Sequence, residues 1–376
     1  MPERESVLIL SVSAGAGHLI AARALEDEFR TQTTQRRVET VDVLAVTRPA
    51  FRRLYGGGYL DVARHAPRLF GWLHDRMDDP RTRHLHEFRA LLQNTFRWPL
   101  IQLVRERRPG LIVNTHFLAS ELMAQERRAG RLDCPHVTVT TDLETHRMWV
   151  HEPCERYYTA TEAGAFYLTT WGVSPERTRV TGIPVRRGFR EPLTRAAARE
   201  KLGLRPERPL VLLLCGGFGV GPTRELLREL IRMPADADVV VLAGRNQRLQ
   251  SDLLAAAHGA ARPVRILGFT DAVHEWMRAA DLAVSKPGGL TVVEALAAGL
   301  PLAIVSPIPG HEMYNSDYVL ENGAGIAVHN PRMLAYRVGR LLAEPERLAR
   351  LSANAAALAR PAAATDIVAD ALSLMR

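Results

Sequence analysis

The residues with the clearest chemical potential lie in the stretch 285–325, where two adjacent glycines precede a run of apolar, helix-forming residues. Gly288 and Gly289 permit a tight turn with exposed backbone amides, and a helix is predicted from Leu290 to Ala298. The first amides of a helix attract anions. Glu294 follows about one turn later, where its carboxylate could accept hydrogen bonds from a pair of hydroxyls such as those of a ribose. This stretch therefore predicts an anion site beside a hydroxyl-binding carboxylate.

A second group of polar residues follows the next predicted strand, Leu302 to Val305. We expect the segment Ser306 to Asp317 to be a loop that brings His311, Glu312 and Asn315 to the carboxyl end of that strand. Open α/β sheets bind their ligands at that end. The alternative interpretation is a glycine-capped helix followed by an ordinary surface loop.

Near the N-terminus a buried strand, Val7 to Val12, is followed by Gly15, Gly17 and His18, and then by a helix from Leu19 to Phe29. A strand, a glycine loop and a helix form the opening unit of a Rossmann-like sheet, although the spacing here differs from GxGxxG. At a helix start the positive end of the dipole lowers the pKa of His18 and favours its neutral, proton-accepting form. The alternative role for His18 is helix capping or packing.

Further polar residues follow two more predicted strands. His116 comes after Leu111 to Asn114, and Asp142 comes after Val137 to Thr141. Because the carboxyl ends of parallel strands meet at one edge of a sheet, these positions suggest a single cleft, whereas a surface loop would explain each residue individually. The segment after Asp142 adds His146, Trp149 and His151.

The second half of the chain opens like the first, with a strand, Leu210 to Leu214, a loop and a helix, Arg224 to Ile231. Its loop contains Gly216, Gly217, Gly219 and Gly221. The repetition predicts two similar α/β domains facing each other, joined near Pro184 to Pro192. The final stretch, Met333 to Met375, reads as alanine- and leucine-rich helix whose end could pack back onto the first domain. We place the first domain at residues 1–188 and the second at 189–376.

Composition limits the class of protein. With 376 residues, 47% of them hydrophobic and 24% charged, the chain is an ordinary globular protein large enough for two domains. Cys134, Cys154 and Cys215 lack the spacing of a disulfide framework or a zinc site, which fits a reducing compartment. No signal peptide and no apolar run long enough to cross a bilayer is visible, so we expect a protein that is soluble or lies on a surface.

The net charge of +8 is concentrated in one segment, residues 48–108, which has 13 arginines against 6 acidic residues and also contains eight aromatic residues. It interrupts the alternation of strands and helices and reads as a helical insertion, with one helix from about Phe88 to Arg107. Basic and aromatic residues at helical spacing suit an anionic membrane interface. A solvated helical subdomain is the alternative, and nucleic acid is the least favoured partner.

These motifs resemble those of the monogalactosyldiacylglycerol synthases and processive diacylglycerol glucosyltransferases, and more distantly those of the bacterial glycosyltransferase that makes lipid II. The resemblance runs from about Val7 to about Ala327. It is carried by SVSAGAGH at the first glycine loop, TTDLETHRMWVH at 140–151, TGIPV at 181–185, GGFGVGP at 216–222, KPGGLTVVEALAAGLP at 286–301 and PIPGHEMYN at 307–315.

The resemblance implies a GT-B fold, that is, two Rossmann-like α/β domains with a deep cleft between them. The second domain would hold the sugar nucleotide and the first the acceptor. It implies that His18 is the catalytic base, which Asp142 could orient. The acceptor side would include Gly15, Gly17, His116, His146 and Trp149.

On the donor side the resemblance implies that Gly288, Gly289 and the following helix lie near the diphosphate and that Glu294 binds the ribose. Phe269 would cover the base, and Glu312 and Asn315 would contact the sugar and phosphates. The remaining donor-side residues are Gly217, Gly219, Lys286 and His311. At His311 the family usually has glutamine, and this departure bears on the choice of sugar.

The leading hypothesis is an inverting UDP-sugar glycosyltransferase that adds glucose or galactose to diacylglycerol. It would work in the cytoplasm as a peripheral protein on the inner face of the cell membrane. UDP-hexose, diacylglycerol and an anionic membrane surface are the expected partners, without nucleic acid. No DxD-type acidic pair is evident, so we expect no metal or other cofactor. The alternatives are a transferase with another lipid or soluble acceptor, a UDP-sugar epimerase and a sugar-nucleotide sensor without enzymatic activity.

Overall fold

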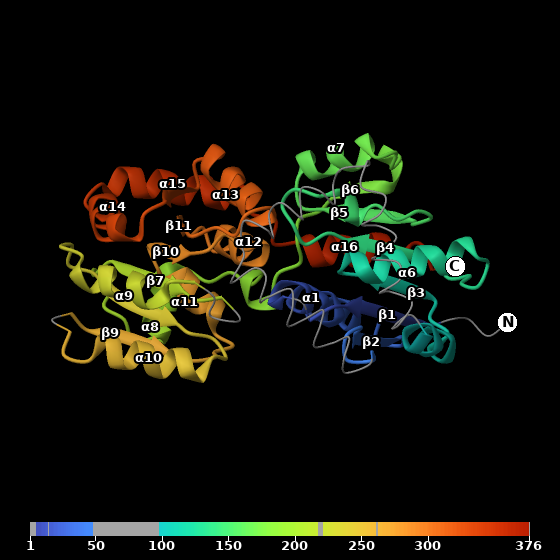
Figure 1. The fold of residues 1–376 in the computed structure, drawn as a ribbon, viewed down its shortest axis with the longest axis horizontal. Coiled ribbons are helices and arrows are strands. Elements are labelled where there is room, and N and C mark those ends of the chain that lie inside the picture. Colours follow the sequence, from blue (N-terminus) through green and yellow to red (C-terminus); the bar gives the residue numbers. More distant parts are fainter. Residues whose placement is uncertain (1–4, 14, 48–97, 217–220, 261, 376) are drawn as a thin grey trace. The chain divides into compact units, whose positions relative to one another are not determined.

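The structure is a computed structural model that describes residues 5–13, 15–47, 98–216, 221–260 and 262–375. The chain divides into two compact units, which Figure 1 colours along the sequence. The first unit comprises Met1–Arg186, Pro309–His311 and Arg360–Arg376, and the second comprises Arg187–Ile308 and Glu312–Ala359. The C-terminal segment thus belongs to the first unit, in agreement with the expected return of the last helix.

The first unit contains a six-stranded parallel sheet in the order β2-β1-β3-β4-β5-β6. Its strands are β1 (Ser6–Ser11), β2 (Arg37–Asp42), β3 (Leu111–Asn114), β4 (His136–Val139), β5 (Arg156–Thr159) and β6 (Thr178–Val180). Its helices are α1 (Ala16–Gln32), α6 (Phe117–Arg128), α7 (Glu162–Thr170) and α16 (Ala363–Leu372), with the 3-10 turns η2 (Arg147–Trp149) and η3 (Pro175–Arg177). Residues 98–107 are also helical.

Both faces of this sheet are buried, which follows from the alternation of side chains along a strand. Val7 and Ile9 of β1 pack in one hydrophobic cluster with residues of α1 and α16. Leu8 and Leu10 pack in another cluster with residues of α6. Ile367 of α16 is fully buried, and burial of such a side chain contributes about 1.5–3 kcal/mol. Figure 1 shows α16 (red) within the first unit, and its packing against α1 explains why the chain returns there.

The second unit has its own six-stranded parallel sheet, in the order β12-β11-β10-β7-β8-β9. Its strands are β7 (Leu210–Leu214), β8 (Asp238–Leu242), β9 (Val264–Leu267), β10 (Leu282–Ser285), β11 (Leu302–Val305) and β12 (Gly325–Val328). Its helices are α8 (Arg195–Lys201), α9 (Thr223–Arg232), α10 (Gln247–Ala257), α11 (Val273–Ala279), α12 (Gly289–Ala297), α13 (His311–Glu321), α14 (Leu334–Leu342) and α15 (Pro345–Ala357), with η4 (Arg187–Phe189) and η5 (Pro331–Met333).

Each sheet has a point at which the strand order reverses direction, and such points bind ligands in open α/β folds. In the first unit the reversal lies between β1 and β3, whose register pairs Leu10 with Asn114. In the second unit it lies between β7 and β10, whose register pairs Leu213 with Val284. The first reversal is followed by the His18 loop and His116, and the second by Gly216 after β7 and by Lys286 after β10.

Two predictions about secondary structure were wrong. The segment Ser306 to Asp317 is not a loop throughout, because α13 begins at His311. Gly310, at a φ of 95°, ends the loop, and the carboxylate of Glu312 in the first turn complements the helix dipole. Likewise, Met333 to Met375 is not continuous helix but contains α14, α15 and α16. Pro345 begins α15, since proline suits the first turn of a helix but not its interior.

The basic insertion lies mostly outside the described residues. Residues 48–97 are not described, so the helix predicted from Phe88 to Arg107 can be compared with the structure only from residue 98. From there to residue 107 the chain is helical, and Leu100 and Val104 pack in the core of the first unit.

Candidate active site

His18 lies in the first turn of α1, which begins at Ala16 with Gly15 as its N-cap. A Cβ at Gly15 would lie 3.8 Å from Cδ2 of the imidazole, an ordinary van der Waals distance, so Gly15 lies directly beside the ring. Asp42, at the end of the neighbouring strand β2, fixes the start of the loop because its Oδ1 accepts hydrogen bonds from the amides of Ser13 and Leu44, each at 3.1 Å.

Two groups contact the Nδ1 atom of His18. The backbone carbonyl of Thr115 is 3.1 Å away, and the hydroxyl of Thr141 is 2.7 Å away. A carbonyl oxygen can only accept a hydrogen bond, so this environment favours the tautomer with a proton on Nδ1. The neutral ring then carries its lone pair on Nε2. This is the arrangement that a general base requires.

His116 is the N-cap of α6 and lies next to His18. Its Nδ1 accepts a hydrogen bond from the amide of Leu118 at 3.1 Å, and its ring centroid is 4.6 Å from that of His18 in an edge-on arrangement. Burial lowers the pKa of His116 well below its usual range; nearby His18 lowers it further, whereas the negative charge of Asp142 opposes the shift. His116 is therefore a neutral neighbour of the imidazole of His18.

Asp142 contacts two aromatic residues of the same segment. The indole Nε1 of Trp149 donates to its Oδ2 at 2.9 Å, and Nε2 of His146 is 3.4 Å from the same oxygen. Trp149 is fully buried, and its ring also contacts His146 and His116. Since Thr141 directly precedes Asp142, these contacts hold in place the peptide that carries the hydroxyl beside His18. Thus His18, His116, Asp142, His146 and Trp149 come together in the first unit.

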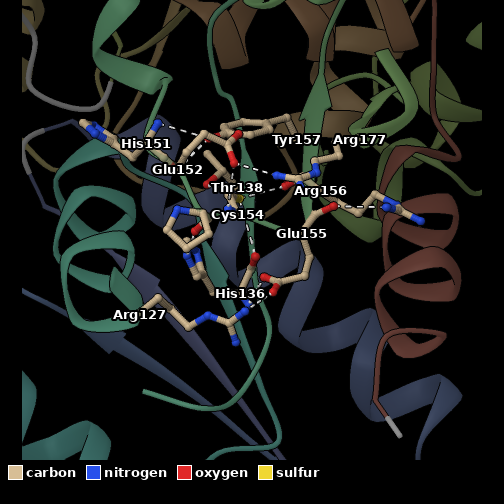
Figure 2. A network of polar contacts seen from close by, with 11 residues as sticks. Arg127, His136, Thr138, His151, Glu152, Cys154, Glu155, Arg156, Tyr157 and Arg177 are labelled. Carbon is tan, nitrogen blue, oxygen red and sulfur yellow. Dashed lines mark hydrogen bonds and ion pairs between the residues drawn. The ribbon is translucent and has the colours of Figure 1, made fainter. Parts of the chain in front are cut away.

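A polar network links β4 and β5 and includes His151, which ends this segment (Figure 2). Glu155 forms an ion pair with Arg127 at 2.6 Å and accepts a hydrogen bond from the amide of His136 at 2.9 Å. Nε2 of His136 lies 2.6 Å from the carbonyl oxygen of Pro153. The hydroxyl of Tyr157 donates to the carbonyl of His151 at 2.7 Å and accepts from the amide of His151 at 3.0 Å. These hydrogen bonds fix the path of the chain between the end of the Asp142 segment and strand β5.

In the second unit, Lys286 and Glu312 lie beside the N-terminus of α12. Nζ of Lys286 is 3.7 Å from Oε1 of Glu312, and Oε2 of Glu312 accepts a hydrogen bond from the amide of Ile308 at 2.7 Å. A Cβ at Gly288 would be 3.8 Å from Oε1 of Glu312, and one at Gly221 would be 3.8 Å from Cδ of Lys286. Gly221 and Gly288 thus lie directly beside this lysine and this carboxylate.

Asn315 is one turn beyond Glu312 on α13, and both side chains face the same loop. Its Nδ2 donates to the carbonyl of Pro287 at 2.9 Å, and the residue is fully buried. Gly288 is the N-cap of α12 and has no side chain that could bind the first amides, and Gly289 begins the helix. A phosphate could accept hydrogen bonds from these amides with Lys286 supplying a positive charge.

The remaining donor-side predictions fall in different places. Glu294 is buried within α12 at 3% exposure. Phe269 follows β9 and is half exposed, with the guanidinium of Arg245 3.8 Å above its ring. Gly217 and Gly219 lie outside the described residues, and His311 is described only as the first residue of α13. The structure therefore brings together Lys286, Gly288, Gly289, Glu312 and Asn315.

Two parts of the chain match models of known families. Residues 18–185 match the model described as "Monogalactosyldiacylglycerol (MGDG) synthase", and residues 225–358 match "Glycosyl transferases group 1". The chain is 34% identical over 387 residues to "Probable monogalactosyldiacylglycerol synthase 2, chloroplastic" of Oryza sativa subsp. japonica, with 97% of this chain and 80% of that protein covered. The chain belongs to the monogalactosyldiacylglycerol synthase family. This confirms the resemblance identified from the motifs.

Another relative of this family is "Processive diacylglycerol beta-glucosyltransferase" of Bacillus licheniformis, which is 30% identical over 357 residues, 94% of this chain and 91% of that protein. Among solved structures, MurG of Acinetobacter baumannii aligns with a TM-score of 0.62 at 14% identity, covering 98% of this chain and 99% of MurG. HepE of Anabaena, solved in complex with UDP, aligns with a TM-score of 0.57 at 16% identity and the same coverage. These structural likenesses confirm the predicted GT-B fold.

Two residues of the candidate active site could not be identified from the sequence. Thr141 was placed inside a strand, yet β4 ends at Val139 and leaves Thr141 in the loop, where it contacts His18. The aromatic neighbour Phe117, whose ring is 5.7 Å from those of both His146 and Trp149, had no motif to mark it. Within the described residues there is no cluster of three or more His, Cys, Asp or Glu side chains suited to a metal ion, nor a helix long and apolar enough to cross a membrane.

Proposed function

We propose that this protein is an inverting glycosyltransferase that moves glucose or galactose from a UDP-hexose to the primary hydroxyl of diacylglycerol. Two of its relatives, at 30% and 34% identity, are named as enzymes that glycosylate diacylglycerol. The geometric observation that carries the proposal is the contact of His18 Nδ1 with the carbonyl of Thr115, since it directs the lone pair to Nε2.

The chemistry asks for a base at the acceptor and for stabilisation of the leaving group. Nε2 of His18 would take the proton of the acceptor hydroxyl while the oxygen attacks the anomeric carbon. The bond from that carbon to the diphosphate breaks, UDP leaves with the electron pair, and the configuration inverts to give a β-glycoside. The neutral His116 beside the base adds no positive charge that would oppose protonation of His18.

Stabilisation of the departing UDP would come from the second unit. The first amides of α12 and the ammonium group of Lys286 suit the developing negative charge on the diphosphate. Glu312 and Asn315 would bind the sugar, Glu294 the ribose and Phe269 the base. No metal ion is needed for this scheme, because amides and a lysine occupy the role that a cation could fill.

The acceptor is a lipid, so we propose that the enzyme acts at a membrane surface, as a peripheral protein on the inner face of the cell membrane. The support is the charge distribution, with 13 arginines and 6 acidic residues in the segment 48–108. Replacing Arg52, Arg53, Arg64 and Arg68 with glutamine should weaken sedimentation with anionic vesicles in a salt-dependent way. Unchanged sedimentation would argue against this part of the proposal.

The activity is tested by release of UDP from UDP-glucose, UDP-galactose or UDP-N-acetylglucosamine with diacylglycerol in anionic vesicles. We expect release with one of the hexoses and a β-linked glycolipid in the mass spectrum and proton NMR spectrum. Absence of UDP release with every donor would overturn the proposal. His18→Ala should lower kcat by about 10²–10⁴-fold, the usual contribution of a general base.

Solved structures of the same fold include a "putative UDP-N-acetylglucosamine 2-epimerase" of Listeria monocytogenes, with a TM-score of 0.62 at 15% identity. An epimerase would convert its UDP-sugar without any acceptor, so an NMR time course of donor and enzyme alone separates the two reactions. A transferase with another acceptor would be identified by a panel of lipid and soluble acceptors at fixed donor.

A further inference from the structure

Helix α7 presents an unusual surface in the first unit. Helix α7 lies at the surface beside β6 (Figure 1), and its one charged residue is the exposed Glu162 in its first turn, whereas the run 163–173 contains none. Phe166 is 70% exposed, the largest value among the exposed large hydrophobic side chains of the described residues. A surface helix normally carries charged side chains on its outer face. Phe166 and Thr170 are exposed here, and Tyr167 and Trp171 beside them are partly buried. We call these four residues the α7 surface.

The opposite face of α7 is packed against the protein, and Trp171 also packs partly against the core, so Phe166 and Thr170 are the most exposed members of the α7 surface. Gly164 and Leu168 are buried at intervals of four residues. A Cβ on Gly164 would lie 3.4 Å from the carbonyl oxygen of Leu143 and from Cγ2 of Thr145, so this face of α7 lies directly against the segment after Asp142. The hydroxyl of Thr145 donates to the carbonyl of Gly164 at 2.7 Å.

These contacts tie α7 to the candidate active site. Leu143 and Thr145 lie within three residues after Asp142, and the N-cap Thr161 donates to the carbonyl of Leu143 at 2.7 Å. The other end of α7 reaches the same segment, because the guanidinium of Arg147 lies 5.1 Å from the ring centroid of Trp171. The α7 surface is thus attached at both ends to the segment that carries Asp142, His146 and Trp149.

Two hydroxyl groups on α7 are hydrogen-bonded within the helix itself. The hydroxyl of Thr169 donates to the carbonyl of Phe166 at 2.6 Å, and that of Thr170 donates to the carbonyl of Tyr167 at 2.7 Å. Hydroxyls bonded to their own helix need no water, so the α7 surface can leave water at little polar cost. Tyrosine and tryptophan beside an arginine are the side chains typical of the headgroup region of a membrane.

We propose that the α7 surface, with Arg147 at its edge, inserts into the headgroup region of an anionic bilayer and places the Asp142 segment at the depth of the acceptor hydroxyl. The phenyl ring of Phe166 enters the acyl boundary, Tyr167 and Trp171 lie at the headgroups, and Arg147 meets lipid phosphate. The choice of a lipid surface as the occupant rests on the proposed function, because a lipid acceptor must reach this segment from a bilayer. The contact is separate from the basic segment 48–108.

The test is flotation of the full-length protein with vesicles of phosphatidylcholine containing phosphatidylglycerol. Phe166→Asp should reduce the bound fraction at high salt as well as at low salt, because salt does not screen an apolar contact. The loss of apolar burial should lower the affinity for vesicles about tenfold. Arg147→Gln should reduce binding at low salt only. The matched controls lie on α10 of the second unit: Leu254→Asp, which replaces a side chain 52% exposed, and Arg248→Gln, an exposed arginine. Both should bind vesicles as the wild type does.

Turnover gives a second readout. Phe166→Asp should lower UDP release with diacylglycerol in vesicles and leave release unchanged with a short-chain diacylglycerol below its critical micelle concentration. If Phe166→Asp binds vesicles as well as the wild type does, the proposal is wrong. It is also wrong if the wild type is a dimer that Phe166→Asp dissociates while vesicle binding persists, because the α7 surface would then be an interface between two copies. Flotation does not depend on turnover. If the protein binds vesicles through Phe166 but releases no UDP, the proposed function is wrong and the proposed membrane contact stands. An unchanged melting temperature confirms that Phe166→Asp folds.

Discussion

His18 and Thr141 stand 123 residues apart in the sequence, yet the hydroxyl of Thr141 lies 2.7 Å from Nδ1 of the imidazole. The contact spans two strand ends, because His18 follows β1 and Thr141 follows β4. With the carbonyl of Thr115 at 3.1 Å from the same nitrogen, it fixes the plane of the ring. The orientation of the proposed base thus depends on a residue that belongs to the Asp142 segment.

Replacing Thr141 with valine keeps the shape of the side chain and removes the hydroxyl. We expect kcat to fall by about five- to tenfold, the equivalent of one neutral hydrogen bond, while the KM for the UDP-hexose stays unchanged. Thr141→Ser should restore most of the rate because the hydroxyl returns. Steady-state kinetics of both variants test this, and a valine variant with wild-type kcat would mean that the hydroxyl of Thr141 is not needed to orient the ring.

Much of this site could be predicted because its residues follow buried strands. The position of His18 after β1 and of His116 after β3 is visible in the sequence, since parallel strands place their carboxyl ends at one edge. Thr141 could not be found in this way. Threonine is a common strand residue, and the end of β4 at Val139 is set by backbone pairing with β5 rather than by side-chain type.

Most of the fold could also be predicted from its buried strands, and the errors in the predicted elements have physical causes. Buried parallel strands such as Leu210–Leu214 are continuous apolar runs, which are easy to identify. The first turn of α13 is rich in polar residues, so it reads as a loop until the left-handed Gly310 before it is known. Hydrophobic periodicity marks the core face of a helix but carries little information about its ends.

The ion pair of Glu312 with Lys286 allows sugar and phosphate binding to be separated. Glutamine at position 312 can still accept the hydrogen bond from Ile308, but it leaves the charge of Lys286 uncompensated. We expect Glu312→Gln to bind free UDP as tightly as wild type or tighter. Its KM for the UDP-hexose should rise by about tenfold, because a sugar hydroxyl loses a charged acceptor.

Lys286→Met removes the positive charge, so we expect it to weaken the binding of free UDP. Titration calorimetry with UDP would compare the affinities of Lys286→Met and Glu312→Gln. A Glu312→Gln variant with weakened UDP binding and an unchanged preference for UDP-hexose over UDP would show that Glu312 serves the phosphate side and not the sugar.

Gly182, in the TGIPV motif, tests the packing of the returning C-terminal segment. Its φ is 96°, and a Cβ there would lie 2.7 Å from Cβ of Arg360, closer than non-bonded carbons approach. Gly130 has a φ of 65° with no atom within 4 Å of the added Cβ. Gly130→Ala should therefore lower the free energy of unfolding by about 1 kcal/mol, the cost of a left-handed alanine. Gly182→Ala should cost about 1–3 kcal/mol more because the segment must also shift. Urea unfolding compares them, and equal losses would exclude strain against Arg360.

The buried imidazole of His136 should make the free energy of unfolding depend on pH. Burial lowers its pKa to about 4 from 6.5, with a further lowering by Arg127 and an opposing effect of the hydrogen bond to Pro153. Between these values the unfolded chain binds a proton that the folded chain does not, so stability is full above pH 6.5 and is lost as the pH falls toward 4. Over the whole window this amounts to about 3 kcal/mol.

The corresponding variant is His136→Gln, which cannot titrate but can still donate to the carbonyl of Pro153. Urea unfolding at several pH values between 4.5 and 7.5 should give a steeper fall of the free energy of unfolding for wild type than for the variant, by about 1.4 kcal/mol per pH unit in the middle of the window. His116, whose pKa is also lowered by burial, contributes equally to both proteins and cancels in the difference. Parallel curves would mean that His136 gains access to water before the protein unfolds, because a solvated imidazole would regain its ordinary pKa.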